Sequence, residues 1–139
     1  MKRREFLEKA GCGAAGLAAA PLSAAGGQSK EPMVVRRFDL EIEVYEVGPE
    51  TRCHKKGEKF AWPKDMGNVC HWLASALDPV CTTLSNGAIL PWKYAGTPYE
   101  KVIDLEGTTT EYIRCPDPSK AGIVVKITRT FKDKRTFQG

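Results

Sequence analysis

The stretch from Gly67 to Gly87 (GNVCHWLASALDPVCTTLSNG) constrains the fold more than any other part of the chain. Apolar residues recur there at the three-and-four spacing of one buried helix face, namely Val69, Trp72, Leu73, Ala76 and Leu77. Asn68 is the expected N-cap, and Asn86-Gly87 fits a helix exit that needs a positive φ. Pro79 is expected to break or kink the helix, which places Cys81 in a separate turn.

The segments around this helix have the patterns of strands. Residues 34–47 alternate strictly, with four apolar side chains facing one way, namely Phe38, Leu40, Ile42 and Val44. The other predicted strands lie at residues 57–62, 102–105, 111–115 and 123–131. We therefore predict a small α+β fold, in which one central helix packs across a mostly antiparallel sheet.

Residues 1–25 have the organisation of an export signal. Paired arginines are followed by a short, weakly apolar stretch and by small residues suited to cleavage after Ala25. The segment resembles a twin-arginine translocation signal, and the matching residues are Arg3, Arg4, Phe6 and Leu7. We expect the twin-arginine export machinery to be a partner and the protein to be periplasmic or otherwise exported. The apolar stretch is too short for a stable membrane span in the mature form.

The remaining chain reads as one domain. We expect a flexible spacer at 26–33, a single domain at 34–131 and a solvated basic tail at 132–139. From residue 26 onward the chain has 17 basic and 15 acidic residues, and their signs are mixed along the sequence. This balance gives no electrostatic footprint for nucleic acid.

Four cysteines follow the predicted cleavage site, and each of the two histidines directly follows a cysteine. Thiolates and imidazoles are the usual ligands of zinc and iron. We predict a site for iron or zinc formed by Cys53, Cys70 and Cys115, with His54, His71 or Cys81 as the fourth ligand. The sequence has no C-x-x-C pair, so spacing does not specify the metal.

Two other functions remain open for these cysteines. An exported domain with four cysteines commonly pairs them, and the favoured pairings are Cys53–Cys115 and Cys70–Cys81. Each such disulfide would contribute about 3 kcal/mol to a structural or interaction protein without a cofactor. Alternatively, Cys70 at a helix N-terminus is the nucleophile of a small enzyme, because a thiolate is favoured there.

Other residues with reactive potential have structural interpretations. Asp117 lies between two prolines and is expected to make a turn rather than to act as a general base. Trp72 is expected in the core, whereas Trp62 and Trp92 have no assigned surroundings. The chain has no nucleophile elbow, no phosphate-binding glycine loop and no H-E-x-x-H pattern.

A series of short motifs falls in a fixed order between Val34 and Phe131. The series is Cys53, Lys56-Gly57-Glu58-Lys59-Phe60, Cys70-His71-Trp72-Leu73, Gly87, Pro91-Trp92 and Cys115-Pro116-Asp117-Pro118. In this order the chain resembles a family of small bacterial and archaeal proteins with no assigned activity. The resemblance implies a fold unit and a site at Cys53, Cys70 and Cys115, but no reaction. We interpret the protein as an exported accessory domain with a metal-binding or redox-linked cysteine site, working beside a periplasmic redox protein or metalloprotein.

Overall fold

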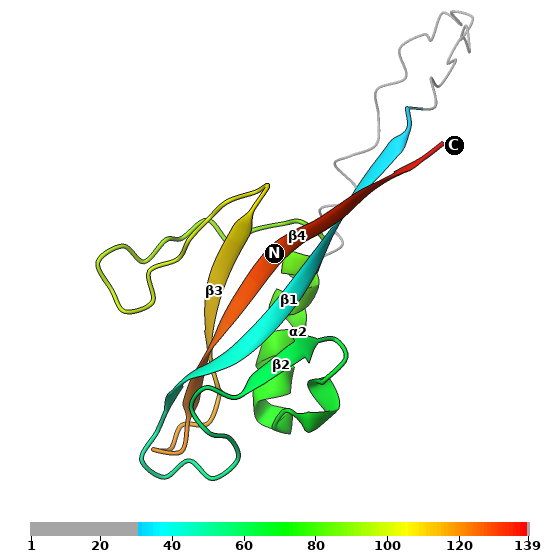
Figure 1. The fold of residues 1–139 in the computed structure, drawn as a ribbon. Coiled ribbons are helices and arrows are strands. Elements are labelled where there is room, and N and C mark those ends of the chain that lie inside the picture. The colour runs from blue at the N-terminus through cyan, green and yellow to red at the C-terminus, as the bar shows by residue number, and fades with distance from the viewer. Residues whose placement is uncertain (1–30, 139) are drawn as a thin grey trace, which may run out of the picture.

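In the computed structural model, which describes residues 31–138, a four-stranded antiparallel sheet carries one α-helix on one face (Figure 1). The strands are β1 (Met33–Val47), β2 (Lys59–Trp62), β3 (Thr108–Arg114) and β4 (Ile123–Phe137). Their order in the sheet is β2-β1-β4-β3. The helix α2 (His71–Ser85) follows a short 3-10 turn, η1 (Met66–Asn68). This arrangement confirms the predicted α+β fold.

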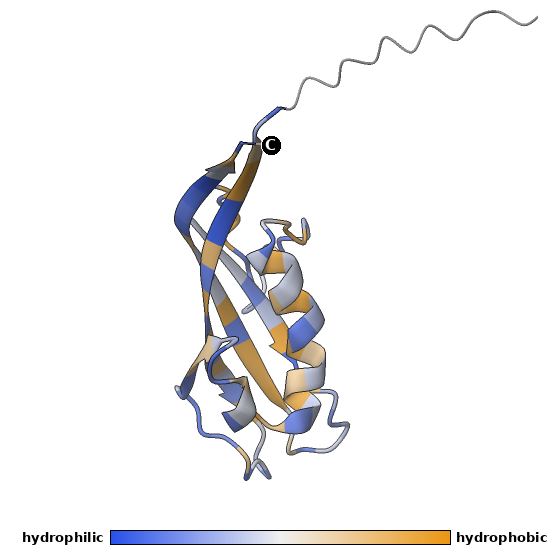
Figure 2. Ribbon diagram, turned by 90° about the vertical axis from the view of Figure 1, so that its right-hand side faces the viewer, coloured by the Kyte–Doolittle hydropathy of each residue, from blue (hydrophilic) through white to orange (hydrophobic). Residues whose placement is uncertain are grey.

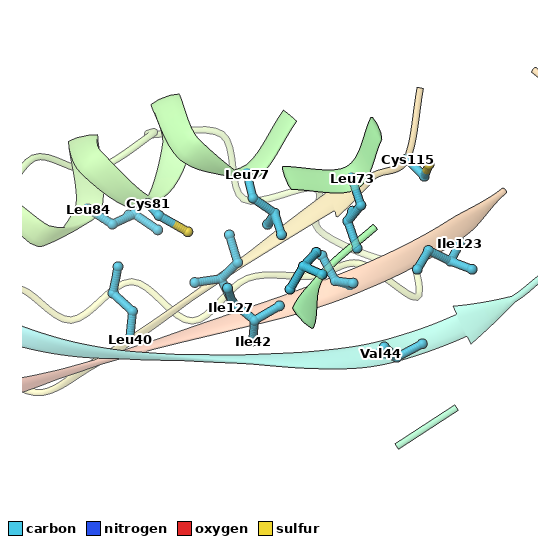
Figure 3. Packing of buried hydrophobic residues seen from close by; sticks show 12 residues of the cluster. Leu40, Ile42, Val44, Leu73, Leu77, Cys81, Leu84, Cys115, Ile123 and Ile127 are labelled. Carbon is cyan, nitrogen blue, oxygen red and sulfur yellow. The ribbon is translucent and has the colours of Figure 1, made fainter. Parts of the chain in front are cut away.

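The core lies between α2 and the facing side of the sheet (Figure 3). Alternation along β1 points Leu40, Ile42 and Val44 at the helix, and the antiparallel register places Ile42 beside Ile127 of β4. The helix contributes a row of buried residues three or four positions apart, namely Leu73, Leu77, Cys81 and Leu84. Colouring by hydropathy shows polar residues on the outer side of the helix (Figure 2).

The helix differs from its prediction at both Pro79 and its N-terminus. Pro79 lies inside α2 without ending it, on the exposed side of the helix. A proline there costs about 3 kcal/mol, but stopping the helix would remove Cys81 and Leu84 from the core. The N-cap is Cys70 rather than Asn68, because Asn68 closes the preceding 3-10 turn.

Strand β4 is longer than predicted. It continues six residues beyond Phe131, so the predicted basic tail is largely a strand. The extension pairs with the start of β1 from Phe137 opposite Met33 to Asp133 opposite Arg37. Together they form a two-stranded ribbon that projects past the helix (Figure 1). Backbone pairing with β1, rather than burial of side chains, sets this length.

Residues 102–105 are not a strand. They run alongside the start of β3, where Val102 exchanges hydrogen bonds with Thr110, but the pairing does not continue as a ladder. Asp104 instead accepts bonds from the N–H groups of Glu106 and Gly107, which turns the chain into β3.

Candidate functional site

Three of the cysteines line one pocket. Cys53 comes from the loop between β1 and β2, Cys70 lies directly before α2, and Cys115 directly follows β3. The pocket has a volume of about 290 Å³. Its other lining residues are Glu50, Arg52, Trp72, Asp117 and Ala121. The structure thus brings together the three cysteines that the sequence analysis grouped, although they are separated by many residues in the chain.

Contacts between two loops set the position of Cys53 relative to Cys115. The N–H of Gly48 donates to the carbonyl of Gly122 (3.1 Å), and the Thr51 hydroxyl donates to the carbonyl of Ala121 (2.7 Å). The approach is so close that a Cβ on Gly48 would lie 2.0 Å from the carbonyl oxygen of Lys120. Only glycine fits there, and the contact fixes one side of the pocket.

His54 connects the Cys53 loop to the start of the helix. Its Nε2 accepts a hydrogen bond from the N–H of Cys70 (2.9 Å), and its Nδ1 lies 3.0 Å from a carboxylate oxygen of Glu58. Since a backbone N–H can only donate, Nε2 is the unprotonated nitrogen and Nδ1–H donates to Glu58. The ring is nearly buried, with 6% of the side chain exposed. Because both nitrogens are engaged, His54 ties its loop to the backbone of Cys70 and does not offer a free fourth ligand.

The charged carboxylate of Glu58 accepts the hydrogen bonds that hold this loop together. Its pKa lies below the usual range because the backbone N–H of Lys55 donates to it and, secondly, because His54 does. Gly57 has a φ of +87°, which allows the turn that brings Glu58 back toward His54. The ring of Phe60 then packs edge-on against His54, with centroids 5.4 Å apart.

The surroundings of Cys53 make a negative charge on its thiol unfavourable. Burial raises the pKa of the Cys53 thiol, and the neighbouring Cys70 and Cys115 raise it further, against a lowering by its own backbone N–H. At neutral pH Cys53 is therefore held as the neutral thiol. A bound cation would reverse this preference, since it stabilises every thiolate that faces it and displaces the protons.

Cys81 lies outside this pocket. It is fully buried in the core, and burial raises the pKa of its thiol to about 12. It lies eleven positions after Cys70, which is about 16 Å along the helix axis. A disulfide requires Cα atoms closer than about 7 Å, so α2 does not permit the predicted Cys70–Cys81 pairing or Cys81 as a fourth ligand.

The remaining predicted residues divide between the pocket and the surface. Cys53, Cys70, Cys81 and Cys115 are all free thiols in the structure, and Cys53 and Cys115 share the pocket. His71 is exposed and is not among the residues that line the pocket. The N–H of Ser119 donates to Asp117 (2.8 Å), and contacts with Ser119 lower the pKa of Asp117. A carboxylate with a lowered pKa is a weak base, so Asp117 stabilises its turn, as predicted.

The placement of Trp72 corrects the prediction that it belongs to the core. It is 54% exposed and forms a wall of the cysteine pocket, while Leu73 beside it is fully buried. The spacing rule could not separate these two neighbours, because adjacent residues lie only about 100° apart around a helix. Trp62 packs partly against the core, and Trp92 is exposed.

The three pocket thiols do not form a preorganised metal site in the described part of the chain. Within residues 31–138 no three histidine, cysteine or acidic side chains are grouped as they would be around a metal ion. Three thiols still match soft or borderline ions in chemistry, and Cys53 lies on an exposed loop. Ligation would therefore need side-chain rotation at the pocket.

Comparisons with known protein families, with curated proteins and with solved structures find no match to this chain. Over residues 31–138, no helix combines the length and apolarity needed to cross a bilayer. The predicted signal residues and the cleavage after Ala25 lie outside the described residues. The fifth cysteine of the chain, Cys12, lies within the predicted signal and is outside them too.

Proposed function

We propose that this protein is an exported accessory domain whose cysteine pocket binds a thiophilic metal ion, zinc or iron. The observation that carries the proposal is the convergence of Cys53, Cys70 and Cys115 on one pocket from three separate segments. When bound, the metal would supply a positive charge that stabilises the thiolates. The expected partner is a periplasmic redox protein or metalloprotein.

The chain's own residues support ligation in specific ways. His54 fixes the spacing between the Cys53 loop and the helix start, as the groups around a ligand must do. Cys70 precedes the first turn of α2, whose unpaired N–H groups favour negative charge. Arg52 and Trp72, which both line the pocket, are exposed, so a fourth ligand from solvent or from a partner can reach it.

Metal content tests this proposal with a matched control within the chain. The full chain carrying Cys12→Ser is expressed in the cytoplasm and purified without oxygen or chelators. We expect about one zinc or iron per chain, lost in Cys53→Ser, Cys70→Ser and Cys115→Ser but retained in Cys81→Ala. Retention of the metal in all three serine variants, or no metal in any sample, would contradict the proposal.

A second candidate is a redox pair of Cys53 and Cys70, which line the same pocket. Oxidation of the two thiols to a Cys53–Cys70 disulfide would release two protons and two electrons. The electrons would pass to a disulfide of a partner protein, which is reduced to two thiols. Mass mapping after incubation with an oxidised thiol–disulfide protein distinguishes this pair from the predicted Cys53–Cys115 staple.

Export is a separate part of the proposal and rests on residues 1–25. Replacement of Arg3 and Arg4 by lysine should retain the precursor in the cytoplasm, while the parent chain is recovered outside with its first 25 residues removed. Equal distribution of the two chains would contradict twin-arginine export without affecting the metal proposal.

A further inference from the structure

A second pocket lies on the face of the sheet opposite α2. Val44 and Ile113 pack toward the core, so their neighbours Tyr45 and Tyr112 point to the other face. Tyr99, from the segment between α2 and β3, completes a cluster with them. The three rings meet edge to face, with centroid separations of 5.1, 5.6 and 6.4 Å.

Two of these rings, those of Tyr99 and Tyr112, border a hollow of about 170 Å³, which we call the tyrosine pocket. Its lining residues are Tyr94, Tyr99, Tyr112, Arg114 and Val124. Most of this surface is aromatic or aliphatic, and Arg114 supplies its only charge. Arg114 makes no salt bridge with a residue in the described range 31–138, so its guanidinium is available to an anion.

Hydrogen bonds hold the aromatic walls in place before any ligand arrives. The Tyr99 hydroxyl donates to a carboxylate oxygen of Glu46 (2.8 Å), and the Tyr45 hydroxyl donates to the carbonyl of Pro98 (3.2 Å). These two bonds tie the segment after α2 to strand β1. Aromatic side chains fixed in this way lose little conformational freedom when they bind.

Tyr94 is fixed by its backbone and by a buried cation. Its φ of +51° is uncommon for a residue other than glycine, and the Thr97 hydroxyl donates to its carbonyl (2.7 Å). The ammonium of Lys101 lies 5.2 Å from the ring centroid and is itself paired with Glu111 (2.6 Å). The Tyr94 ring is therefore already engaged by one cation, which disfavours a second.

We propose that the tyrosine pocket binds a small planar aromatic carboxylate. The ring of the ligand would pack against Tyr99 and Tyr112, and its carboxylate would accept hydrogen bonds from Arg114. A cationic ligand is disfavoured by Arg114, the one charged residue that lines the pocket. This inference is independent of the metal proposal, because it uses none of the cysteines.

Three probes of the same size and different charge test the inference. Benzoate, benzyl alcohol and benzylamine are titrated into the full chain at neutral pH and followed by amide chemical shifts. We expect saturable shifts around Tyr99 and Tyr112 with benzoate only. No binding of benzoate at millimolar concentration, equal binding of the three probes, or preference for benzylamine would overturn the proposal.

Substitutions at two arginines provide the matched control. Arg114→Gln should weaken benzoate binding roughly tenfold or more, because a charge-assisted hydrogen bond is lost. Arg52→Gln, which removes an exposed arginine at the cysteine pocket, should leave the affinity unchanged. Both arginines are exposed, so neither variant threatens the fold. Benzoate affinity that survives Arg114→Gln would show an unspecific apolar hollow and overturn the proposal.

Discussion

The cysteine pocket and the core beneath α2 both contain thiols, but they are built in opposite ways. Cys81 lies among leucines on the buried face of the helix. It behaves as an apolar core residue, because burial suppresses ionisation of its thiol. The pocket cysteines are held where three chain segments meet, by hydrogen bonds between loops rather than by regular packing. The difference shows that cysteine content alone is a poor guide, whereas the support given to each thiol separates a core residue from a candidate ligand.

Gly48→Ala should have the largest effect on stability, because it disturbs the loop contact beside the cysteine pocket. The new Cβ would overlap the carbonyl of Lys120, so the two loops must separate at a cost of about 3 kcal/mol. Urea denaturation measures the loss. Gly67→Ala is the control, since nothing lies within 4 Å of its Cβ position. Equal stability of the two variants would show that the loop contact is unimportant.

Cys81→Ser should be the next largest effect, this time on the core. The serine hydroxyl would be buried among apolar residues without a partner, which costs about 2 kcal/mol. The same change at the exposed Cys53 should alter the free energy of unfolding by less than about 0.5 kcal/mol. Denaturation of both metal-free variants in parallel provides the measurement. Similar losses of unfolding free energy would contradict the distinction between a core cysteine and a pocket cysteine.

His54→Ala should affect both stability and binding. It leaves the N–H of Cys70 without its acceptor, at a cost of about 1 kcal/mol, and loosens the spacing between Cys53 and Cys70. Zinc affinity should fall roughly tenfold, as expected for a group that orients ligands. An unchanged affinity, measured by chelator competition, would remove His54 from the site.

Alkaline pH should produce the smallest effect in the accessible range. The Cys81 thiol has a pKa near 9 when unfolded and about 12 when folded, so the folded state retains its proton more strongly. Its contribution to stability is complete below pH 9 and is lost as the pH rises toward 12. Cys81→Ala should show a shallower decline in stability above pH 9 than the parent chain. An identical decline of stability with pH in the two chains would contradict a raised pKa of the Cys81 thiol in the folded state.

The sheet and the core could be predicted because their patterns are local. Alternation along β1 and β4, and the spacing of Leu73 and Leu77 in the helix, each follow from one periodicity. The grouping of Cys53, Cys70 and Cys115 came from the order of short motifs, and the structure places these residues on one pocket. Their chemistry stays a prediction.

What the sequence did not predict depends on contacts between distant segments. The helix passes Pro79 because buried residues beyond it face the sheet, and β4 reaches Phe137 because β1 pairs with it. The tyrosine pocket was missed for the same reason. Tyr45, Tyr99 and Tyr112 carry no spacing signal and meet only through the antiparallel sheet and the segment that covers it.

Alkylation of individual cysteines tests the central claim most directly. The full chain carrying Cys12→Ser is treated with iodoacetamide, with and without zinc, and each thiol is followed by peptide mass spectrometry. We predict that zinc protects Cys53, Cys70 and Cys115 together, while the buried Cys81 reacts slowly in both conditions. Protection of none of the three, or of one alone, would contradict a shared site.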